Sequence, residues 1–213
     1  EAVCELDERL LATPSLAPQR SHTVAAEMAE RSIRAMQNAL LSISAYTPEL
    51  AQSIRDDEER CDHYEDNLGT YLVKLSAQKM GRSESEEATE LLKSIGDFER
   101  ISDHAVNILE SAEELRGKGI EFSETAQQEL QVLGEALREI MDYAYRSFTA
   151  VDAQTARRIE PVEEVVDDMV ATLRTNHIRR LRDGQCTVYA GLVFLDILIN
   201  AERIADQCSN LGV

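Results

Sequence analysis

Apolar residues recur every three or four positions along most of the chain, which is the spacing of one face of an α-helix. In residues 21–45, for example, Val24, Met28, Met36 and Leu40 fall on one side of a helical wheel. The same pattern continues to the C-terminus and is interrupted only at turn-forming residues. It predicts long helices over residues 21–45, 47–79, 83–115, 125–150, 152–182 and 185–210.

Capping residues and helix breakers set the expected helix ends. Thr47 followed by Pro48 is typical of a helix start, and Ser83 with Glu86 three residues later is typical of a capping box. Pro161 lies inside the fifth predicted helix, so we expect it to kink that helix or to split off a first segment. A short helix is predicted over residues 1–12, and two prolines make residues 13–20 a linker.

The chain contains an internal duplication. The pattern E-R-I-x-D-x-x-x-N occurs at residues 99–107 and again at 202–210, an offset of 103, while E-x-x-D at 59–62 returns at 164–167, an offset of 105. We therefore predict an all-α fold of two repeated three-helix bundles with long antiparallel helices. The expected divisions are residues 1–20 for an N-terminal segment and linker, 21–120 for the first repeat and 121–213 for the second.

The composition narrows the class of partner. The formal net charge of −18 repels nucleic-acid phosphates and anionic lipid, so we expect no nucleic-acid partner. Four cysteines without C-x-x-C spacing indicate reduced thiols, and no run of 18 apolar residues predicts a membrane span. Motifs of nucleophilic or nucleotide-dependent catalysis are absent, and we predict that the protein is not an enzyme.

Carboxylates form the candidate site. Acids three or four residues apart share one helix face, and in each repeat an acidic face of the second helix is expected to meet one of the third. Converging carboxylates need cations between them, and oxygen ligands suit hard ions such as Mg²⁺, Mn²⁺ or ferric iron, with Zn²⁺ also considered. The predicted ligands are Glu59, Asp62, Glu99 and Asp103 in the first repeat, and Glu164, Asp167, Glu202 and Asp206 in the second.

Two alternatives concern the same residues. The acidic stripes could form a solvated face that binds no ion. A ferritin-like di-iron centre is disfavoured, because no histidine in the chain has a glutamate three residues earlier. His104 is expected to form hydrogen bonds beside the ligands, Asn107 and Asn210 to orient ligands or to join helices, and Asp97 to be a surface acid.

These motifs resemble the PhoU domain. The resemblance covers residues 21–213 and rests on the two E-R-I-x-D-x-x-x-N copies within two three-helix repeats. It implies a cytosolic regulator of phosphate uptake and signalling that holds multinuclear metal clusters on these carboxylates. Gln207 and Cys208 replace the His104-Ala105 pair of the first copy, so the second site is expected to bind metal less well.

Residues 6–15 are similar to the segment that joins the membrane part of bacterial sodium/phosphate cotransporters to a PhoU-like domain. That similarity implies a regulatory domain at the inner face of the plasma membrane, with a phosphate transporter in the same polypeptide. The alternatives are a stand-alone phosphate-signalling regulator, or a metal-free helical module for interaction or homodimerisation. A metal-dependent enzyme is the third class.

Overall fold

The computed structural model describes residues 17–78 and 81–212, and within these ranges it contains seven α-helices and no strand. The helices are α1 (Ala17–Ala45), α2 (Pro48–Ser76), α3 (Arg82–Lys118), α4 (Glu124–Ala150), α5 (Ala153–Ala156), α6 (Ile159–Arg182) and α7 (Val188–Asn210). The predicted all-α fold is confirmed. The helix predicted over residues 1–12 lies outside the described residues.

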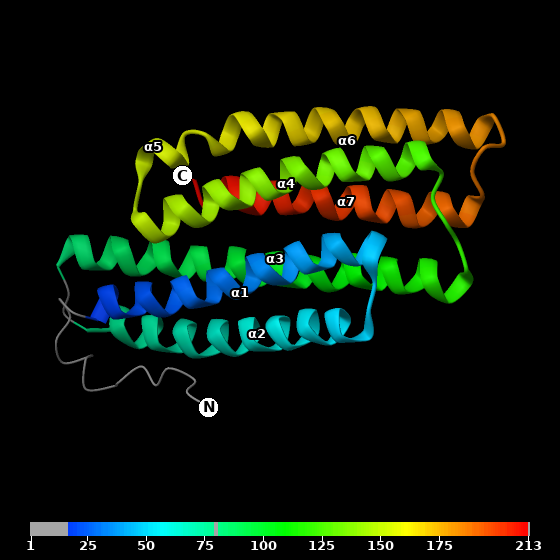
Figure 1. The fold of residues 1–213 in the computed structure, drawn as a ribbon. Helices are drawn as coiled ribbons and strands as arrows, with labels where there is room; N and C mark the ends of the chain where they lie inside the picture. The colour runs from blue at the N-terminus through cyan, green and yellow to red at the C-terminus, as the bar shows by residue number, and fades with distance from the viewer. Residues whose placement is uncertain (1–16, 79–80, 213) are drawn as a thin grey trace.

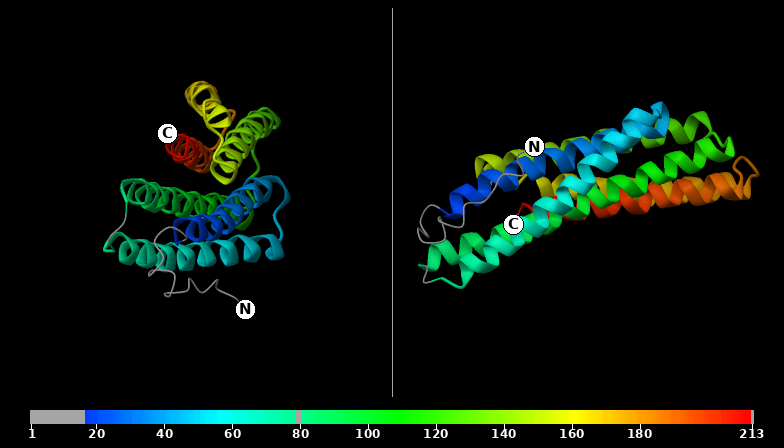
Figure 2. Two further views of the ribbon diagram at one scale, coloured as in Figure 1. Left: turned by 90° about the vertical axis from the view of Figure 1, so that its left-hand side faces the viewer. Right: turned by 90° about the horizontal axis from the view of Figure 1, so that it is seen from below.

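The long helices form two three-helix bundles that pack along their lengths (Figure 1). Helices α1, α2 and α3 form one bundle, and α4, α6 and α7 form the other. The end-on view in Figure 2 shows the two bundles as separate layers, with α3 and α7 side by side between them. Helix α1 also contacts α4, so each bundle contributes two helices to the contact between them.

Local sequence explains most helix ends. Thr47 caps α2 as predicted, since its side chain accepts a hydrogen bond from the Leu50 amide at 3.1 Å. Helix α3 ends at Gly119, whose φ of 60° is the left-handed conformation that glycine adopts without steric cost. Pro161 separates the one-turn helix α5 from α6, where it lies in the first turn and its missing N–H leaves no intrahelical bond unmade.

Several predicted helix starts differ from the structure by one to four residues, including that of α7, which begins at Val188 rather than at residue 185. Helix α1 begins at Ala17 rather than at Ser21. Pro18 was expected to belong to a linker, but a proline is tolerated in the first turn of a helix, because the N–H that it lacks would have no intrahelical partner there. The predicted capping box at Ser83 does not form, since α3 begins at Arg82, whose side chain pairs with Glu86 at 2.7 Å. Ser123 caps α4, in place of the Thr125 capping box that the sequence indicated.

Small residues in α1 allow its helix to approach α3 closely. Alanines recur along its buried face, and the hydroxyl of Ser32 on that face donates to the Phe98 carbonyl at 2.6 Å. The core of the described chain is continuous through both bundles. Phe148 of α4 joins them, stacking on His22 of α1 and meeting Phe98 of α3 edge-on.

The described helices include none with the length and apolar character that crossing a membrane requires. Even the most apolar of them, α7, is broken by charged residues such as Asp196 and Glu202. The apolar positions of α7 instead supply core residues such as Phe194 and Leu198.

Candidate metal centre

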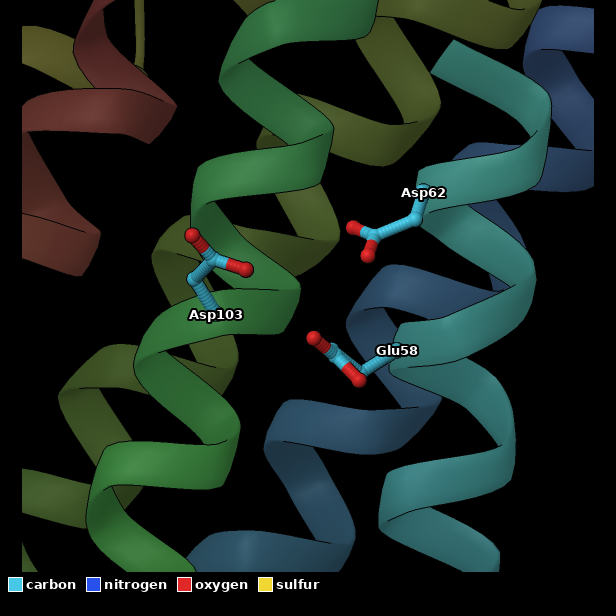
Figure 3. Close-up of side chains that lie close together, drawn as sticks. All are labelled: Glu58, Asp62 and Asp103. Atoms are coloured by element: carbon cyan, nitrogen blue, oxygen red, sulfur yellow. The ribbon is translucent and has the colours of Figure 1, made fainter. Parts of the chain in front are cut away.

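Three carboxylates converge where α2 lies against α3. Glu58 and Asp62 project from consecutive turns of α2 towards Asp103 of α3 (Figure 3). One oxygen from each of the three lies within 4.8 Å of the others. This spacing lets a single cation contact all three groups.

Electrostatics at this first cluster disfavour the charged carboxylates in the absence of a cation. Partial burial raises the pKa of Glu58, and the negative charges of Asp62 and Asp103 raise it further. Burial also raises the pKa of Asp62, with Asp103 as its strongest charged neighbour. Like charges that oppose one another's ionisation become ligands when a cation neutralises them.

Glu99 lies one helical turn before Asp103 and is the most perturbed acid of this region. Burial, the charge of Asp103 and a hydrogen bond shared with Asp103 together raise the pKa of Glu99 to about 7. The charges of Glu65 and Asp62 act in the same direction with smaller effect. Near pH 7 this carboxyl group is therefore protonated in about half of the molecules, and a bound cation would displace that proton.

A second cluster repeats the first in the other bundle. Glu163 and Asp167 of α6 meet Asp206 of α7, again with one oxygen from each lying within 4.8 Å of the others. Burial raises the pKa of Glu163, and the charges of Asp167 and Asp206 add to the shift. The pKa of Asp167 is raised by burial and then by Glu202 and Asp206.

A positively charged side chain lies beside the second cluster and has no equivalent beside the first in the described part of the chain. Arg174 of α6 forms an ion pair with Glu202 of α7 at 3.4 Å, beside the second cluster. The position that corresponds to Arg174 in the first repeat, by the offset of 105, is Gly69. Glu99, the counterpart of Glu202, therefore has no equivalent arginine from α2 among the described residues.

The structure brings together four of the eight predicted ligands, namely Asp62 with Asp103 and Asp167 with Asp206. Glu99 and Glu202 lie one turn along α3 and α7 from these groups. Glu59 and Glu164 are exposed and lie outside both groups, and their sequence neighbours Glu58 and Glu163 occupy those places. The converging groups thus contain Glu58 and Glu163, whereas metal contact by Glu59 and Glu164 stays a prediction.

A signal for the converging glutamate was present in the apolar spacing. Ile159, Val166, Val170 and Leu173 are the buried apolar positions of α6, at intervals of seven, four and three residues. Glu163 lies four residues after the first and three before the second, so it completes the stripe that faces the bundle. Glu58 stands in the same relation to the buried Ile54 and Cys61 of α2.

Side chains next to the first cluster tie α3 to α7. His104 Nδ1 lies 2.9 Å from Asn200 Oδ1, so the imidazole donates a hydrogen bond from that nitrogen. Asn107 donates to the same oxygen at 3.3 Å. The hydrogen-bonding role predicted for His104 agrees with this geometry, and Asn107 joins two helices.

Asp97 is not the surface acid that the sequence indicated. It is 6% exposed, accepts a hydrogen bond from Asn210 at 3.2 Å and lies 3.6 Å from the Arg100 guanidinium. Burial raises the pKa of Asp97, and the bond from Asn210 and the charge of Arg100 oppose that rise. Local sequence contains no signal for the burial of Asp97, because its hydrogen-bond donor Asn210 lies 113 residues later in the chain.

The described cysteines are free thiols. Cys61 and Cys208 are buried and Cys186 is partly buried. Burial raises the pKa of Cys61 to about 12, so the group remains a neutral thiol and is a poor metal ligand at neutral pH.

Comparison with protein families identifies the domain. The sequence profile of the PhoU domain matches residues 25–112 and 130–212, which fall in the two bundles. A curated relative, the phosphate-specific transport system accessory protein PhoU homolog 1 of Thermotoga maritima, is 31% identical over 121 residues, covering 57% of this chain and 51% of that protein. This match thus spans about half the length of the relative.

A second relative, the PhoU homolog of Pseudomonas putida, is 24% identical over 195 residues, covering 91% of this chain and 74% of that protein. The fold is similar to the crystal structure of the phosphate transport system regulatory protein PhoU from Streptococcus pneumoniae, with a TM-score of 0.82, 20% identity and 93% of each chain covered. PhoU from Pseudomonas aeruginosa superposes with a TM-score of 0.75 at 20% identity, covering 96% of this chain and 94% of that one. With both repeats matched by the family profile and the fold shared, this chain belongs to the PhoU domain family.

Proposed function

We propose that this chain is a regulator of phosphate transport that holds hard metal ions on its two carboxylate clusters. The observation that carries the metal site is the repeated convergence of two aspartates and a glutamate, each set with oxygens within 4.8 Å of one another. All-oxygen sets of this kind suit Mg²⁺, Mn²⁺ or iron better than soft ions. Zn²⁺ also accepts carboxylate ligands and belongs in the test.

The regulatory role is supported by the relatives, which are named as accessory proteins of a phosphate-specific transport system. We infer a membrane phosphate transport system as the partner, and action at the cytoplasmic face of the membrane. The proposal does not include a covalent link to the transporter. Residues 6–15, which led us to expect that link, lie outside the described part of the chain.

Metal content of the purified chain tests the sites. The protein is incubated in turn with Mg²⁺, Mn²⁺, Zn²⁺ and Fe³⁺, desalted and analysed for bound metal. We expect stoichiometric metal in the parent and its loss in a variant that combines Asp103→Asn with Asp206→Asn. A matched control, Glu110→Gln with Asp196→Asn, removes exposed acids from the same two helices and keeps the metal.

Circular dichroism must show that each variant remains helical. Absence of metal from the parent with all four ions, or full retention in the Asp103→Asn/Asp206→Asn variant, contradicts the metal proposal. The acids would then be a solvated face of a metal-free module.

The regulatory part has a separate test in the organism that encodes the chain. Deletion of the gene is expected to change the rate of labelled phosphate uptake, and the parent gene to restore it. Unchanged uptake after deletion contradicts the regulatory proposal, whatever the metal analysis shows.

A further inference from the structure

A cavity of about 280 Å³ lies at one end of the second bundle. It is open to solvent and is bordered by the α3–α4 connection, the C-terminal part of α6 and the beginning of α7, at the right-hand end of the molecule in Figure 1. Ala190, at the cavity, and Asp206, at the second carboxylate cluster, are 16 residues apart on α7, a separation of roughly 24 Å at the helical rise. The cavity is therefore distinct from the candidate metal sites.

Two buried polar side chains in the wall of this cavity have atoms without a hydrogen-bond partner. His177 is 1% exposed and its Nε2 has no partner in the described part of the chain. The Nη2 of Arg180 is likewise buried and unpartnered, although its side chain is otherwise well held. Buried donors are nearly always satisfied in native proteins, so these atoms point to a ligand that the chain itself does not supply.

Arg180 is fixed in a way that leaves this one nitrogen available. Its Nη1 pairs with Glu129 at 2.7 Å, and Asn176 donates to the other oxygen of the same carboxylate at 2.9 Å. The guanidinium also lies over the Phe194 ring, with Cζ 5.2 Å from the ring centroid. A guanidinium held on two sides presents its remaining N–H groups without further loss of conformational entropy.

His177 is positioned by the helix next to it. Its ring lies against Phe194, with centroids 5.3 Å apart. Gly191 of α7 makes room for the imidazole, because a Cβ at that position would lie 2.8 Å from both Cε1 and Nε2. The glycine therefore permits a buried imidazole at this wall of the cavity.

The N-termini of two helices add positive potential. Ser123 and Thr187 cap α4 and α7, and both residues line the cavity. A helix N-terminus carries a partial positive charge and unpaired amides, which favour anions. Two acids oppose this potential. Glu129 forms an ion pair with Arg180 that offsets both charges, although its Oε2 is itself a buried atom without a hydrogen-bond partner in the described part of the chain. Glu121 is an exposed residue of the lining.

We propose that this cavity binds a small tetrahedral oxyanion of the inorganic phosphate type. His177 and Arg180 both lie on α6 and the two capped N-termini belong to α4 and α7, so the cavity is lined from three elements. A tetrahedral anion presents oxygens in more directions than a planar carboxylate does. Phosphate near neutral pH carries both O–H and O⁻ groups, so it can pair with either tautomer of a neutral imidazole. The volume lies below the range of roughly 300–1,000 Å³ typical of drug-sized ligands, which fits a small anion.

Calorimetric titration of the full chain with inorganic phosphate tests the proposal, at low ionic strength and with EDTA present to prevent binding through metal. We expect one saturable site in the parent and at least tenfold weaker binding in Arg180→Lys, which keeps the charge and loses Nη2. His177→Phe, which keeps a ring against Phe194 and loses both nitrogens, is expected to weaken binding to the same degree. The matched control Arg179→Lys alters the exposed neighbouring arginine and should change the affinity less than twofold.

Backbone amide spectra recorded during the titration locate the site. Shifts confined to residues 119–126 and 177–194 support it. Absence of saturable binding, unchanged affinity in both cavity variants, or acetate binding as tightly as phosphate overturns the proposal. If Arg180→Lys fails to fold, His177→Phe decides. Because metal is absent from this experiment, its result is independent of the carboxylate sites.

Discussion

The side-chain amide of Asn210 donates to the carboxylate of Asp97 at 3.2 Å, joining the end of α7 to the middle of α3. Asn107 of α3 donates in the same way to Asn200 of α7 at 3.3 Å. Residues 97 and 200 differ by 103, as do residues 107 and 210. The two hydrogen bonds therefore join equivalent positions of the two repeats, with the donor in a different repeat in each case. The asparagine that ends each copied motif thus acts at the interface between repeats.

Removal of the Asn210 amide should destabilise the fold, because it leaves a buried carboxylate with Arg100 at 3.6 Å as its remaining charged partner. We expect Asn210→Ala to lower the free energy of unfolding by about 1–3 kcal/mol, the usual cost of an unsatisfied buried polar group. Urea unfolding followed by circular dichroism measures this change.

The repeat supplies the matched control. Asn107→Ala removes the equivalent hydrogen bond, but its acceptor is a neutral, partly buried amide, so the loss should be below about 1 kcal/mol. Equal losses in the two variants would contradict the role assigned to the buried charge of Asp97.

The Arg174 guanidinium lies beside the second cluster and has no counterpart at the first among the residues that the structure describes. Adding an arginine at the first cluster should weaken metal binding there, and removing Arg174 should strengthen metal binding at the second. Gly69→Arg places a guanidinium in the position from which Arg174 pairs with Glu202, and a Cβ at residue 69 meets only an ordinary contact with Ile95 at 4.0 Å. We expect about fivefold weaker binding at the first cluster, since one added charge near the surface is worth about 1 kcal/mol. Competition with a chromophoric chelator measures the affinity.

Arg174→Gly is the reverse change and should strengthen binding at the second cluster by a similar factor. Each measurement uses a chain whose other cluster is disabled by Asp206→Asn or Asp103→Asn. Affinities that do not respond to either change would show that this arginine does not influence the clusters.

The stability of the metal-free chain should depend on the protonation of Glu99. Its folded pKa of about 7 lies above the usual 4.5, so the folded chain holds a proton that the unfolded chain has already lost within this window. Stability contributed by the protonated group is therefore present at pH 4.5 and is lost as the pH rises through 7. Thermal unfolding in EDTA between pH 4.5 and 8 measures this dependence.

Glu99→Gln isolates the effect from that of the other acids. The variant cannot ionise at this position, and the difference in melting temperature between variant and parent should grow in favour of the variant as the pH rises. A constant difference across the range would contradict a raised pKa for Glu99.

Much of the fold followed from local sequence. The period of the apolar residues predicted the helices, and the offsets of 103 and 105 predicted the duplication, because both depend on residues that are close in sequence or copied. Helix starts were less accurate. Ser83 and Thr125 resembled caps, but the N-cap positions are occupied by Gly81, which makes no side-chain capping bond, and by Ser123, whose side chain accepts from the Ala126 amide. Several neighbouring residues with capping character make the exact start ambiguous.

Residue spacing alone places acids along one face of the second and third helices of each repeat, and it assigns Asp62, Asp103, Asp167 and Asp206 to those faces. The choice between Glu58 and Glu59 depends on the packing against α3, because two adjacent residues differ by about 100° around a helix. The spacing of Ile54 and Cys61 indicates Glu58 only once these two residues are known to be buried. The burial of Asp97 and the cavity beside Arg180 were likewise decided only by the tertiary structure. Each is formed by segments far apart in the chain, and no local pattern records which of them meet.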